Sequence, residues 1–475
     1  MARKIHIIGI AGAGVSAVAV MLKDLGNTVT GSDEGFYEPT ISYLKRHGIN
    51  ILTPYKKENV PNDADLIIIG KHSKLNVAEN EEVALAMTMQ NKVQSFPQVL
   101  GEITKDRENI VVAGSYGKST CSALLSWCLS ESGKDAGYFF GAIPIGFDEN
   151  AHIGTEKQFV LEGDEYPAFG GHENKENKSK FLYMHPKDVI LTSAEHDHVN
   201  IFPTVESYTE PYKKLVALLP TDGLLVVGIN NPNVADIAKE CKAKVVTYGM
   251  DKSAQWGPAD INYGAKTTFG LHKAGEKIVE LSTSLLGTHN IENIVGVSAY
   301  LLEKNLISVE DLKNTVESFG GLKRRLDLKT DKSSVLVYEG FGSSYKKAKT
   351  VFDALKLHFP NKRIITVFEP HTFSWRNKNN LDWYNDIFAD SDETIIFNPP
   401  QHGSATHDQA SLTEILKAAR KNTKNIYGVE SKAEALKILE EKVKSEDIII
   451  LMSSGDLGGL IEEIPAWAEK KFPRP

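Results

Sequence analysis

The stretch that decides the fold runs Val111-Val112-Ala113-Gly114-Ser115-Tyr116-Gly117-Lys118-Ser119-Thr120. An apolar run from Asn109 to Ala113 leads into it, and a run of small residues with helical character, Cys121 to Leu125, follows it. Glycines between a strand and a helix let backbone N–H groups close around phosphate oxygens at the positive end of the helix. The pattern therefore predicts a phosphate-binding loop.

Three side chains in this loop carry specific chemistry. Lys118 would supply a point charge to the outer phosphates, and the hydroxyl of Ser119 or Thr120 would supply a magnesium ligand. The loop is one residue shorter than the common Walker A pattern, because only Ser115 and Tyr116 separate its glycines. A solvated turn is the alternative, but the intact Gly-Lys-Ser-Thr run favours nucleotide binding.

The composition is that of an ordinary globular protein, with 41% hydrophobic and 24% charged residues. A chain of 475 residues is too long for one hydrophobic core and indicates about three domains. Because 54 basic side chains face 62 acidic ones, no basic stripe for nucleic acid is expected. Cys121, Cys128 and Cys241 have no metal-binding spacing, and we expect Cys121 and Cys128 to be core residues of a protein from a reducing compartment.

The N-terminus resembles a signal peptide, since a basic start precedes a largely apolar stretch to Leu22. However, Gly9, Gly12, Gly14 and His6 interrupt the stretch, and a strand, turn and helix explain it better. No other segment approaches the roughly 20 apolar residues of a membrane span. We therefore expect a cytoplasmic protein with no membrane partner.

Short β-branched runs alternate with helical segments, which predicts α/β domains with parallel sheets. The predicted strands are 4–10, 65–70, 109–114, 158–162, 188–193, 223–228, 334–339, 363–369, 393–398 and 447–452. Charged connectors at 104–108 and 318–325 suggest three domains. These are a Rossmann-like N-terminal domain, a central P-loop ATPase-like domain and a C-terminal Rossmann-like α/β domain, over residues 1–105, 106–318 and 319–475.

The first predicted strand opens into a second glycine-rich turn, Gly12-x-Gly14-x-x-Ala17, and Asp33 follows in Gly31-Ser32-Asp33. Such a turn predicts a close backbone approach to a pyrophosphate, with Asp33 toward a ribose or base edge. NAD and a UDP-sugar both carry a pyrophosphate, and a tight turn without a ligand is the third alternative. An NAD dehydrogenase is disfavoured because it would leave Lys118 without a role.

Two acidic clusters follow predicted strands of the central segment, Glu162-Gly163-Asp164-Glu165 and Glu195-His196-Asp197-His198. Ligand sites gather at the carboxyl ends of parallel strands, so both clusters should lie near the phosphate loop. We expect Glu162 and His198 to hold magnesium. A solvated acidic turn and a zinc site made of His196 and His198 are the alternatives.

Farther along, Asn290 and Asn293 lie three residues apart at the predicted start of a helix, where their amides could bond a base or a phosphate. The alternative is that Asn290 only caps the helix. Arg324 and Arg325 in the second connector could reach a phosphate or an anionic substrate, or could simply be surface charges.

Taken together, these motifs resemble the Mur ligase family of peptidoglycan assembly. The loop 113–120 is similar to the family's Ala-Gly-Thr-His-Gly-Lys-Thr-Thr, and the N-terminal glycines with Gly31-Ser32-Asp33 resemble its UDP-N-acetylmuramate domain. The segments 289–293 and 323–327 match two further blocks. Within the family, Glu162-Gly163-Asp164-Glu165-Tyr166 and the segments 180–186, 195–202 and 369–374 look most like the murein peptide ligases. The alanine-adding ligases usually have serine at the tyrosine position.

The resemblance implies a role for each matched residue. ATP would be bound by Gly114, Ser115, Tyr116, Gly117, Lys118, Ser119, Thr120, Asn290, Asn293 and Arg325. The UDP-sugar would be bound by Gly12, Ala13, Gly14, Val15, Ser32, Asp33 and His72. Magnesium would be bound by Ser119, Glu162 and His198, and the catalytic set would be Lys118, Glu162, His198 and Arg325.

The activity implied is ATP-dependent joining of UDP-N-acetylmuramate to an L-Ala-γ-D-Glu-meso-diaminopimelate tripeptide through an acyl phosphate, in peptidoglycan recycling. The expected partners are these small molecules, ATP and Mg²⁺, with the protein a monomer or a weak homo-oligomer. A UDP-N-acetylmuramate–L-alanine ligase is one alternative. A UDP-sugar-binding homologue with impaired catalysis is the other.

One block departs from the family. Its third domain carries Asp-Asp-Phe/Tyr-Ala/Gly-His-His/Ser-Pro after a strand, and the aligned stretch here is Glu339-Gly340-Phe341-Gly342-Ser343-Ser344-Tyr345. Gly340 cannot replace a carboxylate that engages nucleotide. The resemblance therefore implies either that another residue substitutes or that turnover is weakened or altered.

Overall fold

The computed structural model describes residues 2–35, 38, 40–72, 74–89, 92–168, 178–198, 201–400 and 408–474. Over these residues the chain forms two compact units. The first consists of Met1–Asp260, Phe269–Leu281 and Glu292–Phe319, and the second of Ile261–Thr268, Ser282–Ile291 and Gly320–Pro475. In the described residues no helix is both long and apolar enough to span a bilayer.

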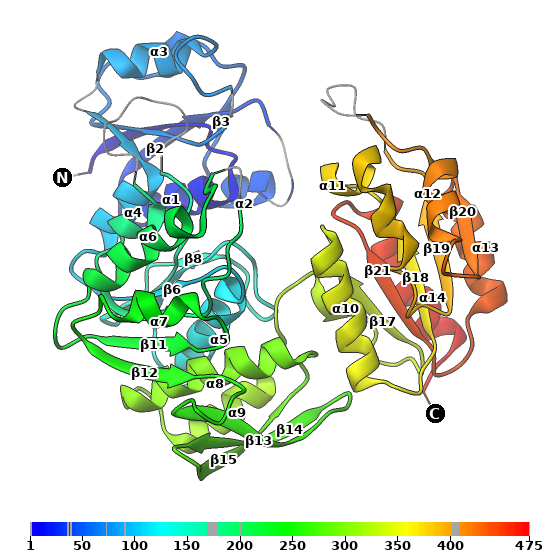
Figure 1. The fold of residues 1–475 in the computed structure, drawn as a ribbon. Coiled ribbons are helices and arrows are strands. Elements are labelled where there is room, and N and C mark those ends of the chain that lie inside the picture. Colours follow the sequence, from blue (N-terminus) through cyan, green and yellow to red (C-terminus); the bar gives the residue numbers. More distant parts are fainter. Residues whose placement is uncertain are drawn as a thin grey trace. The chain divides into compact units, whose positions relative to one another are not determined.

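The first unit begins with a parallel sheet in the order β3-β2-β1-β4-β5, of which β2 and β3 are labelled in Figure 1. Its strands are β1 Lys4–Ile8, β2 Thr28–Ser32, β3 Ile51–Leu52, β4 Leu66–Ile69 and β5 Val93–Ser95. Its helices are α1 Ala13–Asp24, α2 Thr40–Arg46, η1 Lys57–Asn59, α3 Glu81–Thr88 and α4 Phe96–Thr104. Because β4 is buried along its whole length, it has the continuous apolar sequence of a central parallel strand.

A larger sheet follows, in the order β15-β14-β13-β12-β11-β10-β6-β9-β7-β8. Its strands are β6 Glu108–Ala113, β7 Gly137–Phe139, β8 Ala151–His152, β9 Gln158–Glu162, β10 Pro186–Leu191, β11 Leu224–Gly228, β12 Lys244–Tyr248, β13 Trp256–Asn262, β14 Thr267–Lys273 and β15 Glu276–Thr283. The helices are α5 Lys118–Glu131, η3 Lys180–Tyr183, α6 Val205–Ala217, α7 Asn233–Ala238, α8 Thr288–Glu303 and α9 Val309–Ser318. Strand β6 lies between β9 and β10 and runs parallel to both, so its loop faces two neighbouring strand ends.

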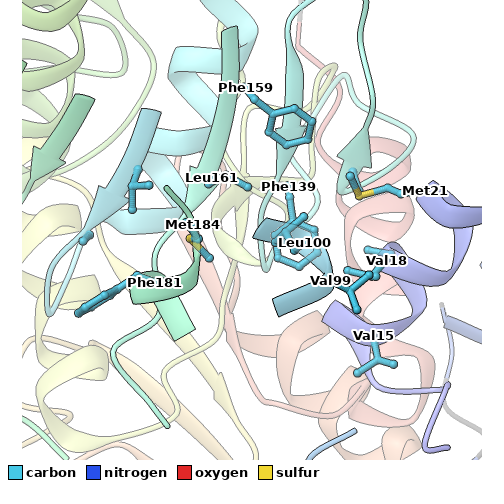
Figure 2. Close-up of a cluster of buried hydrophobic side chains, with 14 of the residues drawn as sticks. Val15, Val18, Met21, Val99, Leu100, Phe139, Phe159, Leu161, Phe181 and Met184 are labelled. Atoms are coloured by element: carbon cyan, nitrogen blue, oxygen red, sulfur yellow. The ribbon is translucent and has the colours of Figure 1, made fainter. Parts of the chain in front are cut away.

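These two sheets share one hydrophobic core (Figure 2). Val15, Val18 and Met21 of α1 lie in the same buried cluster as Val99 and Leu100 of α4. The larger sheet and its connections add further members to this cluster, namely Phe139, Phe159, Leu161, Phe181 and Met184. Apolar packing therefore fixes the two glycine-rich turns of the first unit with respect to each other.

The second unit contains a sheet in the order β16-β17-β21-β18-β19-β20. The strands are β16 Arg325–Leu328, β17 Leu336–Gly340, β18 Ile364–Phe368, β19 Glu393–Phe397, β20 Ile426–Val429 and β21 Ile448–Met452, of which β16 is antiparallel to β17. Its helices are α10 Tyr345–His358, α11 Phe373–Arg376, η4 Lys378–Asn385, α12 Leu412–Ala419, α13 Lys432–Lys442, η5 Leu457–Gly459 and α14 Leu460–Lys471.

The predicted α/β class is confirmed, and each predicted strand overlaps an observed one. The N-terminal apolar stretch forms β1 and α1, as expected from its glycines. Cys121 and Cys128 are fully buried, and burial raises the pKa of both thiols. Strands β2, β3, β5, β7, β8, β12–β16 and β20 were not predicted, because they are short or only partly buried and lack a continuous apolar run.

Candidate active site

The phosphate-loop glycines have conformations that other residues adopt only with strain. Gly114 has φ +140°, and a Cβ there would lie 2.2 Å from Thr192 Oγ1. Gly117 has φ +79°, and a Cβ there would lie 2.5 Å from Asn293 Oδ1. The loop therefore passes close to the end of β10 on one side and to α8 on the other, which explains both glycines.

The loop is braced by the end of β10. The N–H of Ser115 donates to the Ser193 carbonyl at 3.3 Å, and the N–H of Tyr116 donates to Ser193 Oγ at 3.2 Å. The Ser115 hydroxyl donates to the Glu195 carbonyl at 2.6 Å and accepts from Tyr208. The predicted strand–loop–helix arrangement is thus present, with α5 starting at Lys118.

Lys118 is held by protein groups in this structure. Its ammonium donates to the Gly114 carbonyl and forms an ion pair with Glu165 Oε2 at 3.1 Å. Glu165 is 1% exposed, so its charge is compensated by this pair and by its neighbours. Phosphate oxygens reaching Lys118 would take the place of this carboxylate.

Two of the predicted magnesium ligands lie together. The Ser119 hydroxyl donates to Glu162 Oε1 at 2.7 Å, and Glu162 Oε2 accepts from the N–H of Gly141 at 2.7 Å. Both groups offer hard oxygen atoms, which suit magnesium, so this corner fits the predicted ion. Within the described residues, no three His, Cys, Asp or Glu side chains are grouped to hold a metal. Further ligands would have to come from phosphate oxygens and water.

Both ring nitrogens of His198, the third predicted ligand, contact protein side chains. Its Nδ1 is hydrogen-bonded to the Tyr166 hydroxyl at 2.8 Å, and its Nε2 lies 3.3 Å from Glu165 Oε1. Burial and nearby carboxylates, above all Glu165, raise the pKa of Tyr166, so the phenol keeps its hydrogen at neutral pH. His196 Nε2 is bonded to the Phe202 carbonyl at 2.7 Å, which gives the zinc alternative no support.

A cavity of about 660 Å³ joins the two glycine-rich turns of the first unit. Its lining includes many of the predicted residues: Gly12, Ala13, Gly14, Val15, Asp33, His72, Lys118, Glu162 and His198. Figure 2 shows side chains of α1 in one buried cluster with Phe139 of β7 and Leu161 of β9. The N-terminal glycine turn and Lys118 of the phosphate loop both line this one, partly open cavity.

Asp33 and Ser32 support the N-terminal turn. Asp33 Oδ2 accepts from the N–H of Ala11 at 2.8 Å, and Oδ1 accepts from the hydroxyl of Tyr55 at 3.2 Å. The Ser32 side chain is fully buried and donates to Glu82, so it does not line the cavity. In this structure the Ser32 hydroxyl holds Glu82, so a role for Ser32 toward the UDP-sugar stays a prediction.

Sequence reasoning missed the lysines of the cavity, Lys71, Lys74 and Lys180. Lys71 donates to the Pro167 carbonyl at 3.0 Å, and its ammonium lies 5.4 Å from the centre of the Tyr166 ring. Burial and the charge of Lys180 lower the pKa of Lys71. A signal was available, because Lys71 and His72 directly follow the carboxyl end of β4, where ligand sites gather.

The predicted residues Asn290, Asn293 and Arg325 do not line the cavity. Asn293 belongs to the first unit and packs on Gly117, with the Cys121 thiol 3.4 Å from its Oδ1. Asn290 and Arg325 belong to the second unit, whereas all residues lining the cavity belong to the first. Asn290 Nδ2 donates to the Leu286 carbonyl at 2.8 Å, and Arg325 is exposed.

The divergent block of the second unit has a structural explanation. Glu339 is buried and forms ion pairs with Arg324 at 2.8 Å and Lys329 at 3.4 Å, so it supports the sheet. A Cβ on Gly340 would lie 3.3 Å from Ile450 Cδ1 and 3.5 Å from Val351 Cγ2. Position 340 thus faces apolar side chains, where a carboxylate would be unsolvated.

Known proteins are similar to this sequence over nearly the whole chain. Residues 112–301 match the Mur ligase middle domain, and residues 4–108 match the catalytic domain of the Mur ligase family. A UDP-N-acetylmuramate–L-alanine ligase of Acetivibrio thermocellus is 29% identical over 96% of this chain and 94% of its own. A UDP-N-acetylmuramate–L-alanyl-γ-D-glutamyl-meso-2,6-diaminoheptandioate ligase of Escherichia coli is 27% identical over 98% and 99% of the two chains.

A solved structure has a similar fold over nearly the whole chain. The UDP-N-acetylmuramate–alanine ligase of Thermotoga maritima superposes with a TM-score of 0.78 over 98% of this chain and 99% of its own, at 20% identity. This likeness extends the shared fold to the second unit, beyond the two matched domains. With its sequence matches and its three α/β domains, the chain belongs to the Mur ligase family, and it is a ligase.

Proposed function

We propose that this ligase uses ATP to join UDP-N-acetylmuramate to an L-Ala-γ-D-Glu-meso-diaminopimelate tripeptide. The observation that carries the proposal is the cavity of about 660 Å³, lined by the N-terminal glycine turn, Lys118 and Glu162 together. A UDP-sugar on the glycine turn would have its carboxylate directed toward the phosphate loop in the same space. We assign sugar binding to residues 1–105, nucleotide binding to residues 106–318 and peptide binding to residues 319–475.

The chemistry follows from the weakness of a carboxylate as an acylating group. ATP would transfer its γ-phosphoryl group to the sugar carboxylate, and the peptide amine would attack the resulting acyl phosphate with loss of inorganic phosphate. Lys118 would leave Glu165 and neutralise the transferring phosphoryl group. Magnesium held by Ser119, Glu162 and phosphate oxygens would neutralise further charge there.

The tripeptide is favoured as acceptor by the run Glu162-Gly163-Asp164-Glu165-Tyr166, which resembles the murein peptide branch. The E. coli relative is named for joining that tripeptide, whereas the A. thermocellus relative is named for joining L-alanine. L-Alanine is therefore the alternative acceptor. Because ATP and UDP-sugars are cytoplasmic metabolites, we place the reaction in the cytoplasm, without nucleic acid or membrane as a partner.

A second candidate is a UDP-sugar-binding homologue with impaired catalysis, and the observation that favours it is the apolar surroundings of Gly340. A carboxylate that other family members use there for nucleotide is missing. Such a homologue would bind the UDP-sugar in the cavity but would not catalyse the ligation.

The test is ADP release by purified protein with ATP, Mg²⁺ and UDP-N-acetylmuramate, with tripeptide, L-alanine or no acceptor. Tripeptide-dependent ADP supports the proposal, and L-alanine-dependent ADP supports the alternative acceptor. If neither acceptor releases ADP while calorimetry detects UDP-sugar binding, the impaired homologue is supported. The absence of both turnover and binding would reject all three.

A further inference from the structure

Tyr166 has several contacts in the cavity that the proposed reaction does not use. It follows the acidic residues after β9 and lines the cavity. Its hydroxyl is 2.8 Å from His198 Nδ1, and the two rings meet edge-on with centroids 4.6 Å apart. Tyrosine and histidine are thus joined both by a hydrogen bond and by ring contact.

The other side of the imidazole faces the phosphate loop. His198 Nε2 lies 3.3 Å from Glu165 Oε1, and Glu165 Oε2 is paired with Lys118. The contact of Tyr166 with Nδ1 therefore leaves Nε2 on the side of Glu165 and Lys118.

The backbone of His198 adds a reason for such a contact. Its φ is +54°, a left-handed conformation that costs free energy in a non-glycine residue and persists only where surrounding contacts hold it. Tyr166 is itself held: the Lys71 ammonium lies 5.4 Å from its ring centre and donates to the carbonyl of the next residue, Pro167. The Lys180 ammonium lies 6.0 Å from the same ring.

We propose that Tyr166 is a positioning residue that keeps Nδ1 of His198 engaged, so that Nε2 stays directed at the cavity beside Glu165 and Lys118. A phenol can either donate to Nδ1 or accept from it, so it can hold the ring in both tautomers. Phenylalanine can do neither, and the hydroxyl of a serine at position 166 would be too short to reach. The kinetic part of the test rests on the proposed ligase reaction.

The decisive variant is Tyr166→Phe, which keeps the ring beneath Lys71 and Lys180 but removes the hydroxyl. We expect kcat to fall about tenfold, because one directed hydrogen bond is lost, with KM for ATP and UDP-N-acetylmuramate within about twofold of the parent. Tyr427→Phe is the matched control, since it removes a hydroxyl bonded to Glu393 at 3.0 Å on β20 of the second unit. It should leave kcat unchanged.

Nitrogen NMR of protein labelled with ¹⁵N-histidine provides a readout independent of turnover, with the His198 signal assigned by His198→Asn. The His198 Nδ1 signal should shift between the parent and Tyr166→Phe, because Nδ1 loses its hydrogen-bond partner. Unchanged kcat or an unchanged His198 Nδ1 signal in Tyr166→Phe would overturn the inference. If the parent protein releases no ADP, the proposed reaction fails, and the NMR spectra alone decide the role of Tyr166.

Discussion

The ammonium of Lys118 and the carboxylate of Glu165 form an ion pair at 3.1 Å, and Glu165 is almost completely buried. The carboxylate thus neutralises the cation that we propose for nucleotide binding. In the proposed reaction the phosphate oxygens of ATP compete with this carboxylate for the Lys118 ammonium, which also donates to the Gly114 carbonyl.

This competition predicts the effect of weakening the pair. Glu165→Gln should bind ATP about threefold to tenfold more tightly, because a neutral amide holds Lys118 less strongly than a carboxylate. Isothermal titration with a non-hydrolysable ATP analogue measures the change. Asp164→Asn is the matched control, since Asp164 pairs with Lys180 instead. Unchanged or weaker nucleotide binding in Glu165→Gln would contradict the prediction.

The magnesium corner predicts a change in metal requirement. Ser119→Ala removes the hydroxyl that lies 2.7 Å from Glu162 Oε1, so the Mg²⁺ concentration for half-maximal ADP release should rise about tenfold. A magnesium titration at saturating ATP measures it. Ser122→Ala is the control, because Ser122 lies on the same helix and is fully buried. An unaltered titration curve for Ser119→Ala would remove Ser119 from the ligand set.

The contact between Gly117 and Asn293 predicts a specific cost for a side chain in the loop. Gly117→Ala should destabilise the protein by about 1–3 kcal/mol, since it combines a strained φ with a Cβ 2.5 Å from Asn293 Oδ1. Gly133→Ala is the matched control, because Gly133 has φ +78° with nothing within 4 Å. Urea unfolding should show a smaller loss for Gly133→Ala. Equal losses would mean that the Asn293 contact contributes nothing.

The apolar surroundings of Gly340 predict that an aspartate at position 340, as in the family's sequence block, will not restore nucleotide engagement there. Gly340→Asp should lower the free energy of unfolding by about 2–4 kcal/mol and should not raise ADP release, because the carboxylate would meet Ile450 and Val351. Gly340→Ala places only a methyl group there and should cost less than about 1 kcal/mol. Unfolding curves and the ADP assay test both variants. Increased turnover in Gly340→Asp would support the impaired homologue instead.

His289 in the second unit predicts a stability that falls in acid. Desolvation by the surrounding protein atoms and the nearby His358 lower its pKa to about 4, against about 6.5 for a histidine in the unfolded chain. The neutral ring therefore stabilises the fold fully above about pH 6.5, and this contribution is lost as the pH falls toward 4. Because His289 is exposed to solvent, screening keeps this loss small, on the order of 1 kcal/mol. Urea unfolding at pH 7, 5 and 4 should show a steeper decline for the parent than for His289→Asn. Parallel declines would refute the assignment.

Local sequence was sufficient for the features that form within one strand–turn–helix segment. The glycines around Lys118 and the apolar run before them predicted the loop, because backbone conformation and strand burial depend on neighbouring residues. The buried strands were predicted for the same reason, since a strand covered on both faces has a continuous apolar sequence, as in β4 and β21.

Only the tertiary structure decided which side chains meet. Lys118 pairs with Glu165, Tyr166 with His198, and Ser32 with Glu82, although 47, 32 and 50 residues separate them. Such pairs depend on how α1, α4, β7 and β9 pack into one core, and packing is a sum of many contacts that no single motif encodes. The sequence therefore determined the chemical groups and their local supports, and packing determined their partners.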